Sequence, residues 1–150
     1  MKNLEVKIKK LHPDAVIPSY AKLGDAGLDL TAVEITHPRI EACGPYVEID
    51  TGLAFEIPEG YVGLVFPRSS IVPKTSYVLG NSVGVIDSQY RGSIKFRFRD
   101  LNNLYGRAVY NVGDRIGQIV ILPYPEINLV EVEELSETDR GEGGFGSSGE

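Results

Sequence analysis

Apolar and polar residues alternate along most of this chain, and the alternation predicts strands rather than helices. The clearest example spans residues 93–99, Ser-Ile-Lys-Phe-Arg-Phe-Arg, where three large apolar residues alternate with three cations. One side of this strand would be buried, and the other would face water or a ligand. No segment carries a sustained helical stripe of ten or more residues. Residues 69–72 could begin one helical turn with a serine cap.

Further strands are expected where short alternating or β-branched runs are bounded by turn residues. They cover residues 4–9, 28–32, 47–51, 53–57, 61–66, 82–86, 108–111, 115–122 and 127–135, with a turn region at 37–45. The chain contains 17 glycines and 9 prolines, which punctuate these short segments. The pattern predicts an all-β antiparallel domain of the sandwich, jelly-roll or barrel type.

Length, charge and cysteine content narrow the function classes. The 150 residues fit one domain, and 42% apolar residues suffice for an ordinary core. A formal net charge of -6 argues against binding a nucleic-acid polymer. The single cysteine excludes an intramolecular disulfide framework, and no apolar run is long enough for a membrane helix or a signal peptide. We therefore expect a cytoplasmic protein without a membrane or nucleic-acid partner.

The most informative stretch covers residues 80–92, Gly-Asn-Ser-Val-Gly-Val-Ile-Asp-Ser-Gln-Tyr-Arg-Gly. Asp87 and Ser88 favour a tight turn because their side chains can bond nearby backbone amides, so a β-hairpin with strands at 82–86 and 93–99 is expected. A carboxylate at such a bend can act as a general base on a bound water, with the Tyr90 ring beside it. A plain Asp-Ser turn with a packed tyrosine is the alternative.

Five short motifs follow one another in the chain. They are Asp-Ala-Gly-Leu-Asp-Leu at 25–30, Pro-Arg-Ser-Ser at 67–70, Gly-Val-Ile-Asp-Ser-Gln-Tyr-Arg-Gly at 84–92, Gly-Asp-Arg-Ile-Gly-Gln at 113–118 and Arg-Gly-Glu-Gly-Gly-Phe-Gly-Ser-Ser-Gly at 140–149. Each motif is weak alone, but five in a fixed order at domain-sized spacing are hard to obtain by chance. Together they resemble the trimeric all-β deoxyuridine triphosphatases (dUTPases).

This resemblance implies an enzyme that hydrolyses dUTP to dUMP and pyrophosphate, keeping uracil out of DNA and supplying dUMP for thymidylate synthesis. It also implies a distorted jelly-roll fold, a homotrimer with shared active sites, and Mg²⁺ as cofactor. Asp87 would activate the water that attacks the α-phosphorus. Asp29 would lie near the water shell of the Mg²⁺ bound to the triphosphate.

The resemblance assigns the substrate-binding residues in four groups. The phosphate chain would be lined by Arg68, Ser69, Ser70 and Gln118. Uracil would be read by Asn81 and by the backbone of Gly84, Val85 and Ile86. Tyr90 would pack under the deoxyribose and exclude a 2′-hydroxyl, and Lys95 would contribute from the next strand. The glycine-rich end would supply Arg140, Ser147 and Ser148 near the terminal phosphate, with Phe145 stacked on the base and followed by Gly146.

The chain divides by composition into a β-domain, expected over residues 1–136, and a C-terminal segment over residues 137–150. Glycine and serine dominate the second part, which favours a disordered tail. The family motif instead favours a lid over the bound nucleotide. Both hold if the segment is flexible when free and becomes ordered around the ligand.

Two other functions stay open from the sequence. The related dCTP deaminases share the fold and carry an arginine-serine-serine motif, which Ser70 matches where dUTPases often have glycine. They lack the Asp-Ser-x-Tyr sequence and the glycine-rich tail with its phenylalanine, both of which this chain has. A catalytically silent trimer that serves as a nucleotide-binding or signalling module is the other alternative. The full set of charged and aromatic site residues argues against it.

Overall fold

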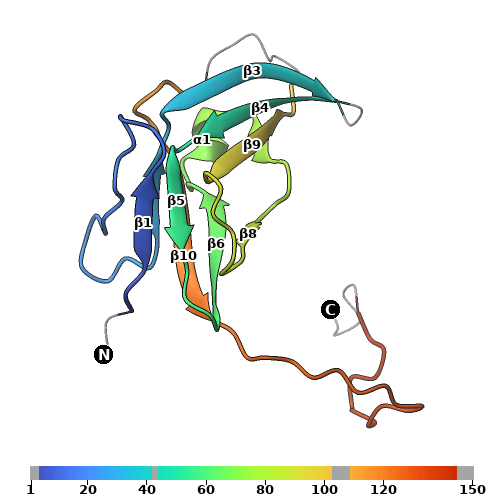
Figure 1. The fold of residues 1–150 in the computed structure, drawn as a ribbon. Helices are drawn as coiled ribbons and strands as arrows, with labels where there is room; N and C mark the ends of the chain where they lie inside the picture. Colours follow the sequence, from blue (N-terminus) through green and yellow to red (C-terminus); the bar gives the residue numbers. More distant parts are fainter. Residues whose placement is uncertain (1–3, 42–43, 103–108, 145–150) are drawn as a thin grey trace.

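The computed structural model describes residues 4–41, 44–102 and 109–144, with only the backbone for 37–41 (Figure 1). The described chain contains one short helix, α1 (Ile71–Lys74). Its strands are β1 (Lys7–Lys10), β2 (Leu28–Thr31), β3 (Glu34–Glu41), β4 (Gly44–Asp50), β5 (Leu53–Glu56), β6 (Tyr61–Pro67), β7 (Tyr77–Leu79), β8 (Gly84–Ile86), β9 (Lys95–Asp100) and β10 (Arg115–Pro123). None of the described helical residues forms a segment long and apolar enough to cross a membrane.

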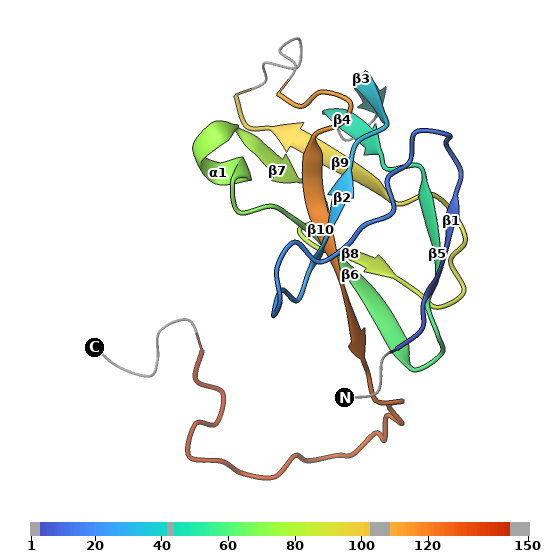
Figure 2. The ribbon, with the colours of Figure 1, turned by 90° about the vertical axis from the view of Figure 1, so that its left-hand side faces the viewer.

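The strands form three antiparallel sheets, with the orders β1-β5, β2-β10-β6-β8 and β3-β4-β9-β7. Strand β10 pairs with β6 along its length and with β2 at its start. In Figure 1 the sheet containing β3, β4 and β9 lies across the end of the strands β1, β5, β6 and β10, and Figure 2 shows the same arrangement from the side. The prediction of an all-β antiparallel fold is confirmed.

One hydrophobic core joins the inner faces of all three sheets. Phe96 and Phe98 of β9 are fully buried and stack with ring centroids 5.8 Å apart, while the cations that alternate with them point outward. Leu30 of β2, Val65 of β6 and Ile119 of β10 meet them from the second sheet. Burying each such side chain contributes about 1.5–3 kcal/mol. Because alternate strand residues face opposite sides, the outer faces remain available for ligands.

The predicted hairpin around Asp87 is wrong. Strand β8 pairs with β6, whereas β9 pairs with β4 and β7 in the other four-stranded sheet. The tight turn is present, because the Tyr90 amide donates to the Asp87 carbonyl at 3.1 Å. The segment therefore connects two sheets. Local turn residues favour a reversal of the chain, but they do not determine which strand each arm pairs with.

Several other predicted strands also differ from the structure. Strand β3 occupies much of the predicted turn region at 37–45, and β7 has no counterpart among the predicted strands. The predicted strands at 108–111 and 127–135 are wrong, since no strand occurs at the described residues 109–111 or at 127–135. The helical turn after Ser70 is confirmed, although the Ser70 side chain makes no capping hydrogen bond.

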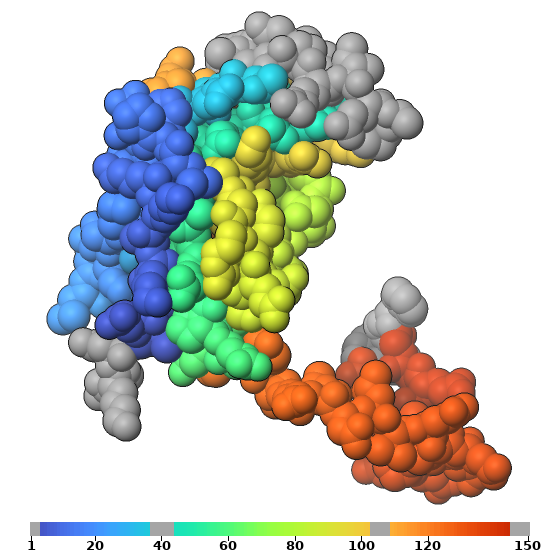
Figure 3. Space-filling view, viewed as in Figure 1, coloured from blue at the N-terminus to red at the C-terminus, as the bar shows by residue number. Residues whose placement is uncertain are grey.

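Beyond Tyr124 the chain runs away from the core as an extended tail (Figures 1 and 3). Residues 125–142 are all exposed, including large apolar side chains such as Leu129, of which 89% is accessible. The tail makes local turns, in which the Gly141 amide donates to Thr138 and the Gly143 amide donates to Arg140. Its apolar residues therefore lack a covering surface within the described part of their own chain.

Candidate active site

A pocket of about 410 Å³ lies beside the segment that connects β8 to β9. We call it the loop pocket. Its lining residues are Val65, Leu79, Asn81, Gly84, Val85, Ile86, Asp87, Tyr90, Ser93, Ile94, Lys95 and Arg97. A general-base candidate, an aromatic ring and the edge of a strand therefore meet in one cavity.

One wall of the loop pocket is formed by β8 and the turn before it, and its backbone is closely packed. A β-carbon on Gly84 would lie 3.3 Å from the Val65 β-carbon, so glycine permits the close approach of β8 to β6. Ser82 has φ of 61°, a left-handed conformation that is uncommon for serine. The Val83 amide donates across this turn to the Asn81 carbonyl at 2.6 Å. Backbone strain of this kind is concentrated at functional sites, and this turn carries Asn81, which lines the pocket.

Tyr90 is held at the hydroxyl end of its ring. Its hydroxyl donates to the Ser93 carbonyl at 3.1 Å. A β-carbon on Gly92 would lie only 2.4 Å from the Tyr90 hydroxyl oxygen and 2.6 Å from the Tyr90 Cζ atom. The ring therefore occupies space that any side chain at position 92 would fill.

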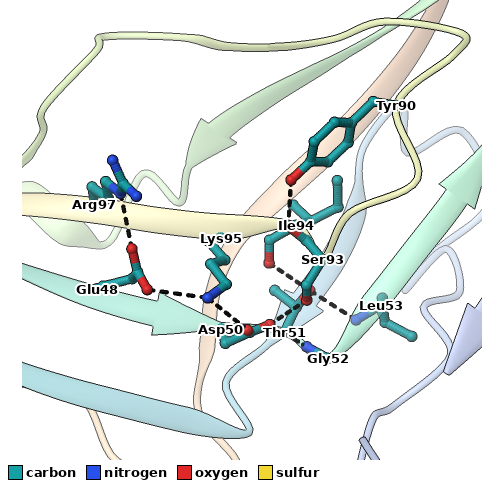
Figure 4. Close-up of polar contacts among 10 residues, drawn as sticks. All are labelled: Glu48, Asp50, Thr51, Gly52, Leu53, Tyr90, Ser93, Ile94, Lys95 and Arg97. Carbon is teal, nitrogen blue, oxygen red and sulfur yellow. Dashed lines mark hydrogen bonds and ion pairs between the residues drawn. The ribbon is translucent and has the colours of Figure 1, made fainter. Parts of the chain in front are cut away.

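The cations of the loop pocket are paired with carboxylates of β4 (Figure 4). Lys95 Nζ lies 3.1 Å from Glu48 Oε1 and 3.3 Å from Asp50 Oδ2, and Arg97 Nε lies 2.9 Å from Glu48 Oε2. The hydrogen bond to Glu48 raises the pKa of Lys95, and the bond to Asp50 acts in the same direction. Lys95 is therefore charged, and the two carboxylates of β4 hold its ammonium group in place.

A second pocket, of about 360 Å³, lies on the outer face of the sheet that contains β2, β10 and β6. We call it the sheet pocket. Its lining residues are Ala21, Asp25, Ala26, Gly27, Asp29, Phe66, Arg68, Ser69, Gln118 and Val120. Gln118 is in register with Asp29 of β2 and with Phe66 of β6, so three side chains form a row across the strands.

Charge and hydrogen-bonding groups converge in the sheet pocket. Asp29 accepts a hydrogen bond from Arg115 at 2.8 Å and lies 3.4 Å from Arg68 Nε. Ser69 adds an exposed hydroxyl, and Gln118 adds an amide. A guanidinium, an amide and a hydroxyl beside a carboxylate form a set that can bind phosphate oxygens and the water shell of a hard cation.

The two pockets open on opposite faces of one sheet. Val65 lines the loop pocket and the next residue of β6, Phe66, lines the sheet pocket. Consecutive strand residues point to opposite sides, so the backbone of β6 separates the two cavities. No residue lines both pockets among those the structure describes.

Comparison with known proteins decides the family. A family model described as dUTPase matches residues 14–149. The chain belongs to the dUTPase family. The predictions of this family and of an enzyme are thereby confirmed.

Individual relatives of this dUTPase-family chain agree. The deoxyuridine 5′-triphosphate nucleotidohydrolase of Escherichia phage T5 is 46% identical over 151 residues, covering 96% of this chain and 98% of the relative. The solved dUTPase of Staphylococcus bacteriophage 80alpha with dUPNHPP is 30% identical and has a TM-score of 0.78, covering 98% of this chain and 99% of that one. A mutant dUTPase of phage phi11 of S. aureus, described with a structural Mg(II) ion, is 28% identical with a TM-score of 0.71, covering 87% and 98%.

The predicted site residues of this dUTPase-family chain fall into separate places. The loop pocket contains Asp87, Asn81, Gly84, Val85, Ile86, Tyr90 and Lys95. The sheet pocket contains Asp29, Arg68, Ser69 and Gln118. Ser70 lines a neighbouring hollow with Lys74 and Arg115. Arg140 lies on the tail, with its Nε donating to the Gly143 carbonyl at 2.9 Å. Phe145, Gly146, Ser147 and Ser148 lie outside the described residues.

Sequence reasoning missed the carboxylates that support the loop pocket. Glu48 and Asp50 alternate on one side of β4, directly opposite Arg97 and Lys95 of β9. Matching alternation of opposite charges on two strands is a usable signal for cross-strand pairs. It becomes decisive only when the pairing of two strands that lie far apart in the sequence is known.

Proposed function

We propose that this chain hydrolyses dUTP to dUMP and pyrophosphate, with Asp87 as the general base. The observation that carries the proposal is the loop pocket. It combines a strand edge that can read a base, a ring that can pack on a sugar, and a carboxylate. Base recognition, sugar packing and activation of water at the α-phosphorus each require one of these groups, and all three line the same cavity.

Uracil recognition is assigned to Asn81 and to β8. In the described sheet β8 has only β6 as a neighbour, so its other edge offers backbone amides and carbonyls. Uracil presents a donor between two acceptors and can complete this edge. Cytosine would leave polar groups of the site unpaired, which is the strongest source of discrimination between similar ligands. Tyr90 packs against the deoxyribose and leaves no room for a 2′-hydroxyl.

The sheet pocket is assigned to the phosphate chain. A triphosphate carries about four negative charges, which Arg68, Ser69 and Gln118 can partly balance and bond. The Asp29 carboxylate suits the water shell of a Mg²⁺ ion, since hard cations prefer oxygen ligands. The described residues contain no group of three potential metal ligands. When bound, Mg²⁺ neutralises charge on the phosphate oxygens.

In the chemical step, Asp87 accepts a proton from a water molecule as the water oxygen forms a bond to the α-phosphorus. The bond between the α-phosphorus and the oxygen that bridges to the β-phosphate breaks. Pyrophosphate leaves with the electron pair of that bond. Asp87 then releases its proton to solvent.

We also infer that each active site is shared between copies of the chain in a homotrimer. The loop and sheet pockets open on opposite faces of one sheet, so one nucleotide cannot enter both from the same chain without passing around the sheet. A second copy could place its sheet pocket against the loop pocket of the first. The tail supports association as well, because its exposed apolar residues Ile127, Leu129, Val130, Val132 and Leu135 need a surface to cover them.

The tail is assigned a closing role. We propose a β-domain over residues 1–136 and a lid over residues 137–150, with Arg140 and Phe145 brought to the nucleotide of another copy. A lid must come from the least stable part of a fold, and the exposed tail meets this condition. The cytoplasmic location stays a prediction from the sequence.

Pyrophosphate release tests the proposed function directly. Purified protein with Mg²⁺ should release pyrophosphate from dUTP, and act at least about 100-fold more slowly on dCTP and UTP. Ammonia released from dCTP would indicate a deaminase instead. Nucleotide binding without pyrophosphate or ammonia would indicate a silent binding module.

A further inference from the structure

The chain turns a corner between β4 and β5, at residues 50–53. Asp50 connects this corner to the loop pocket, because it contacts the lining residues Ser93 and Lys95. The Asp50 carboxylate accepts a hydrogen bond from the Ser93 hydroxyl and another from the Gly52 amide at 2.7 Å. Its second oxygen lies 3.3 Å from Lys95 Nζ. The Asp50 side chain is only 18% exposed, so these polar groups replace most of its water.

The same corner fixes the backbone that follows the loop. Both the amide and the hydroxyl of Thr51 donate to the Ile94 carbonyl, at 3.1 and 2.8 Å, and the Ile94 amide donates to the Leu53 carbonyl at 2.8 Å. Thr51 and Ile94 are almost completely buried. Residue 93 is therefore joined to a rigid segment on its C-terminal side and is oriented by Asp50 through its side chain (Figure 4).

Tyr90 is connected to this corner through Ser93. The Tyr90 hydroxyl donates to the Ser93 carbonyl, and the Ser93 hydroxyl donates to Asp50, so one residue links the ring to the carboxylate. Tyr90 is 45% exposed and therefore depends on such anchors for a fixed ring orientation. The Ser93 carbonyl shares a planar peptide unit with the Ile94 amide, so it moves only if the backbone of Ser93 shifts against that anchor.

We propose that Asp50 and Ser93 are positioning residues for Tyr90, and that they sharpen selectivity for deoxyribose over ribose. This inference rests on the proposed function. With Ser93 held by Asp50, the ring stays where a 2′-hydroxyl would clash. Without that bond, the ring can tilt and make room for the hydroxyl. Asp50 is not needed to keep Lys95 paired, because Glu48 lies 3.1 Å from the same ammonium.

The test compares Asp50→Ala, Ser93→Ala and the conservative Asp50→Asn. The readout is the ratio of kcat/KM for dUTP to kcat/KM for UTP, which a general loss of stability would not change selectively. Asp50→Ala and Ser93→Ala should lower the ratio about tenfold, as expected for one hydrogen bond to a charged group. Asp50→Asn keeps an acceptor oxygen for Ser93 and should stay within about twofold of the wild type.

A double variant supplies the decisive comparison. If Asp50 acts through Tyr90, Asp50→Ala combined with Tyr90→Ala should have the same ratio as Tyr90→Ala alone, because the ring is already absent. Additive losses, or an unchanged ratio in both Asp50→Ala and Ser93→Ala, would overturn the proposal. Equal losses in Asp50→Asn and Asp50→Ala with no loss in Ser93→Ala would also overturn it, and would indicate a purely electrostatic role.

The matched control is Glu56→Gln. Glu56 lies on β5, the next strand in the chain, and forms a surface ion pair with Lys7 at 3.0 Å, so its variant loses a carboxylate without touching Ser93. Its ratio should equal that of the wild type. If Asp50→Ala does not fold, Ser93→Ala decides alone, since it removes only one hydroxyl. A wild-type protein that does not hydrolyse dUTP would refute the proposed function itself, before any variant is compared, and the positioning role with it.

Discussion

The loop pocket and the sheet pocket are built in different ways. The sheet pocket takes its polar groups from strands in register, with Asp29 and Gln118 side by side on β2 and β10. The loop pocket takes its groups from an irregular connection between two sheets, with a strained turn at Ser82 and a ring packed on Gly92. Strands fix the spacing of charges, which suits phosphates. An irregular backbone can follow the outline of a base and a sugar.

The pockets also differ in what they lack for binding a nucleoside triphosphate. The two cations of the loop pocket, Lys95 and Arg97, are paired with Glu48, so little positive charge is left for phosphates. The sheet pocket has Arg68, Ser69 and Gln118 beside a carboxylate, whereas its described lining residues include no tyrosine. Each pocket therefore has groups that the other lacks, in agreement with our proposal that the complete site uses both.

Removing the carboxylate of the loop pocket should have the largest effect. Asp87→Asn keeps the shape of the cavity but cannot accept the proton of the attacking water. We expect turnover of dUTP to fall by roughly 10²–10⁴ with little change in nucleotide affinity. Steady-state kinetics and binding of a non-hydrolysable dUTP analogue measure the two quantities. Asp14→Asn, at an exposed carboxylate outside both pockets, is the control. Near-normal turnover in Asp87→Asn would exclude Asp87 as the base.

The tail lies outside both pockets in this structure. Removing it tests whether dUTP is hydrolysed without a lid. We expect deletion of residues 140–150 to lower dUTP hydrolysis about 100-fold or more, because the nucleotide would stay open to water. The melting temperature should hardly change, since the described residues of this segment are almost all exposed. Phe145→Trp would add the only tryptophan of the chain, and its fluorescence should respond to a dUTP analogue with Mg²⁺. Full activity of the truncated protein would show that the tail has no role as a lid.

The two pockets were not equally predictable from sequence. The alternation at Ile94, Phe96 and Phe98 predicts β9 and its buried face correctly, because side-chain direction follows sequence position within a strand. Asp87 and Gln118 were found through motifs. Asp50 and Ser93 were not, because their contact joins residues 43 positions apart and depends on the pairing of β4 with β9. The sequence also did not predict that the two pockets are separate. The turn residues at Asp87 cannot show that β8 and β9 belong to different sheets.

Mixing two inactive variants would show whether the pockets of different copies meet. Asp87→Asn damages only the loop pocket, and Arg68→Ala damages only the sheet pocket. Each alone should be nearly inactive. If the chains are co-expressed in equal amounts and associate at random, about a quarter of the shared sites contain one intact pocket of each kind. The mixture should therefore regain about a quarter of wild-type activity.

The control for this experiment is the double variant that carries both substitutions, mixed with the wild-type chain. Here the shared sites that combine two intact pockets also make up about a quarter, so the two mixtures should agree. If each site were formed within one chain, the double variant mixed with the wild type would keep about half of the activity. The two single variants would then stay at their parental level when mixed.

Two glycine substitutions should have the smallest effects on kinetics. They also distinguish most clearly between the roles of the two pockets. An added β-carbon on Gly27 would lie 2.1 Å from Gln118 Oε1, and one on Gly92 would lie 2.4 Å from the Tyr90 hydroxyl. In each case the atom that must move belongs to a side chain, so the fold should survive. Gly27→Ala displaces an amide of the sheet pocket, and Gly92→Ala displaces the ring of the loop pocket.

Phosphates are identical in dUTP and UTP, whereas the sugars differ. Gly27→Ala should therefore raise KM for both nucleotides by about threefold and leave the ratio of their kcat/KM values unchanged, as expected from losing one hydrogen bond. Gly92→Ala should lower that ratio by about threefold, because the displaced ring no longer fills the space of a 2′-hydroxyl. Parallel kinetics on both substrates measure the difference. A changed ratio in Gly27→Ala, or an unchanged one in Gly92→Ala, would contradict the assignment of phosphate to one pocket and sugar to the other.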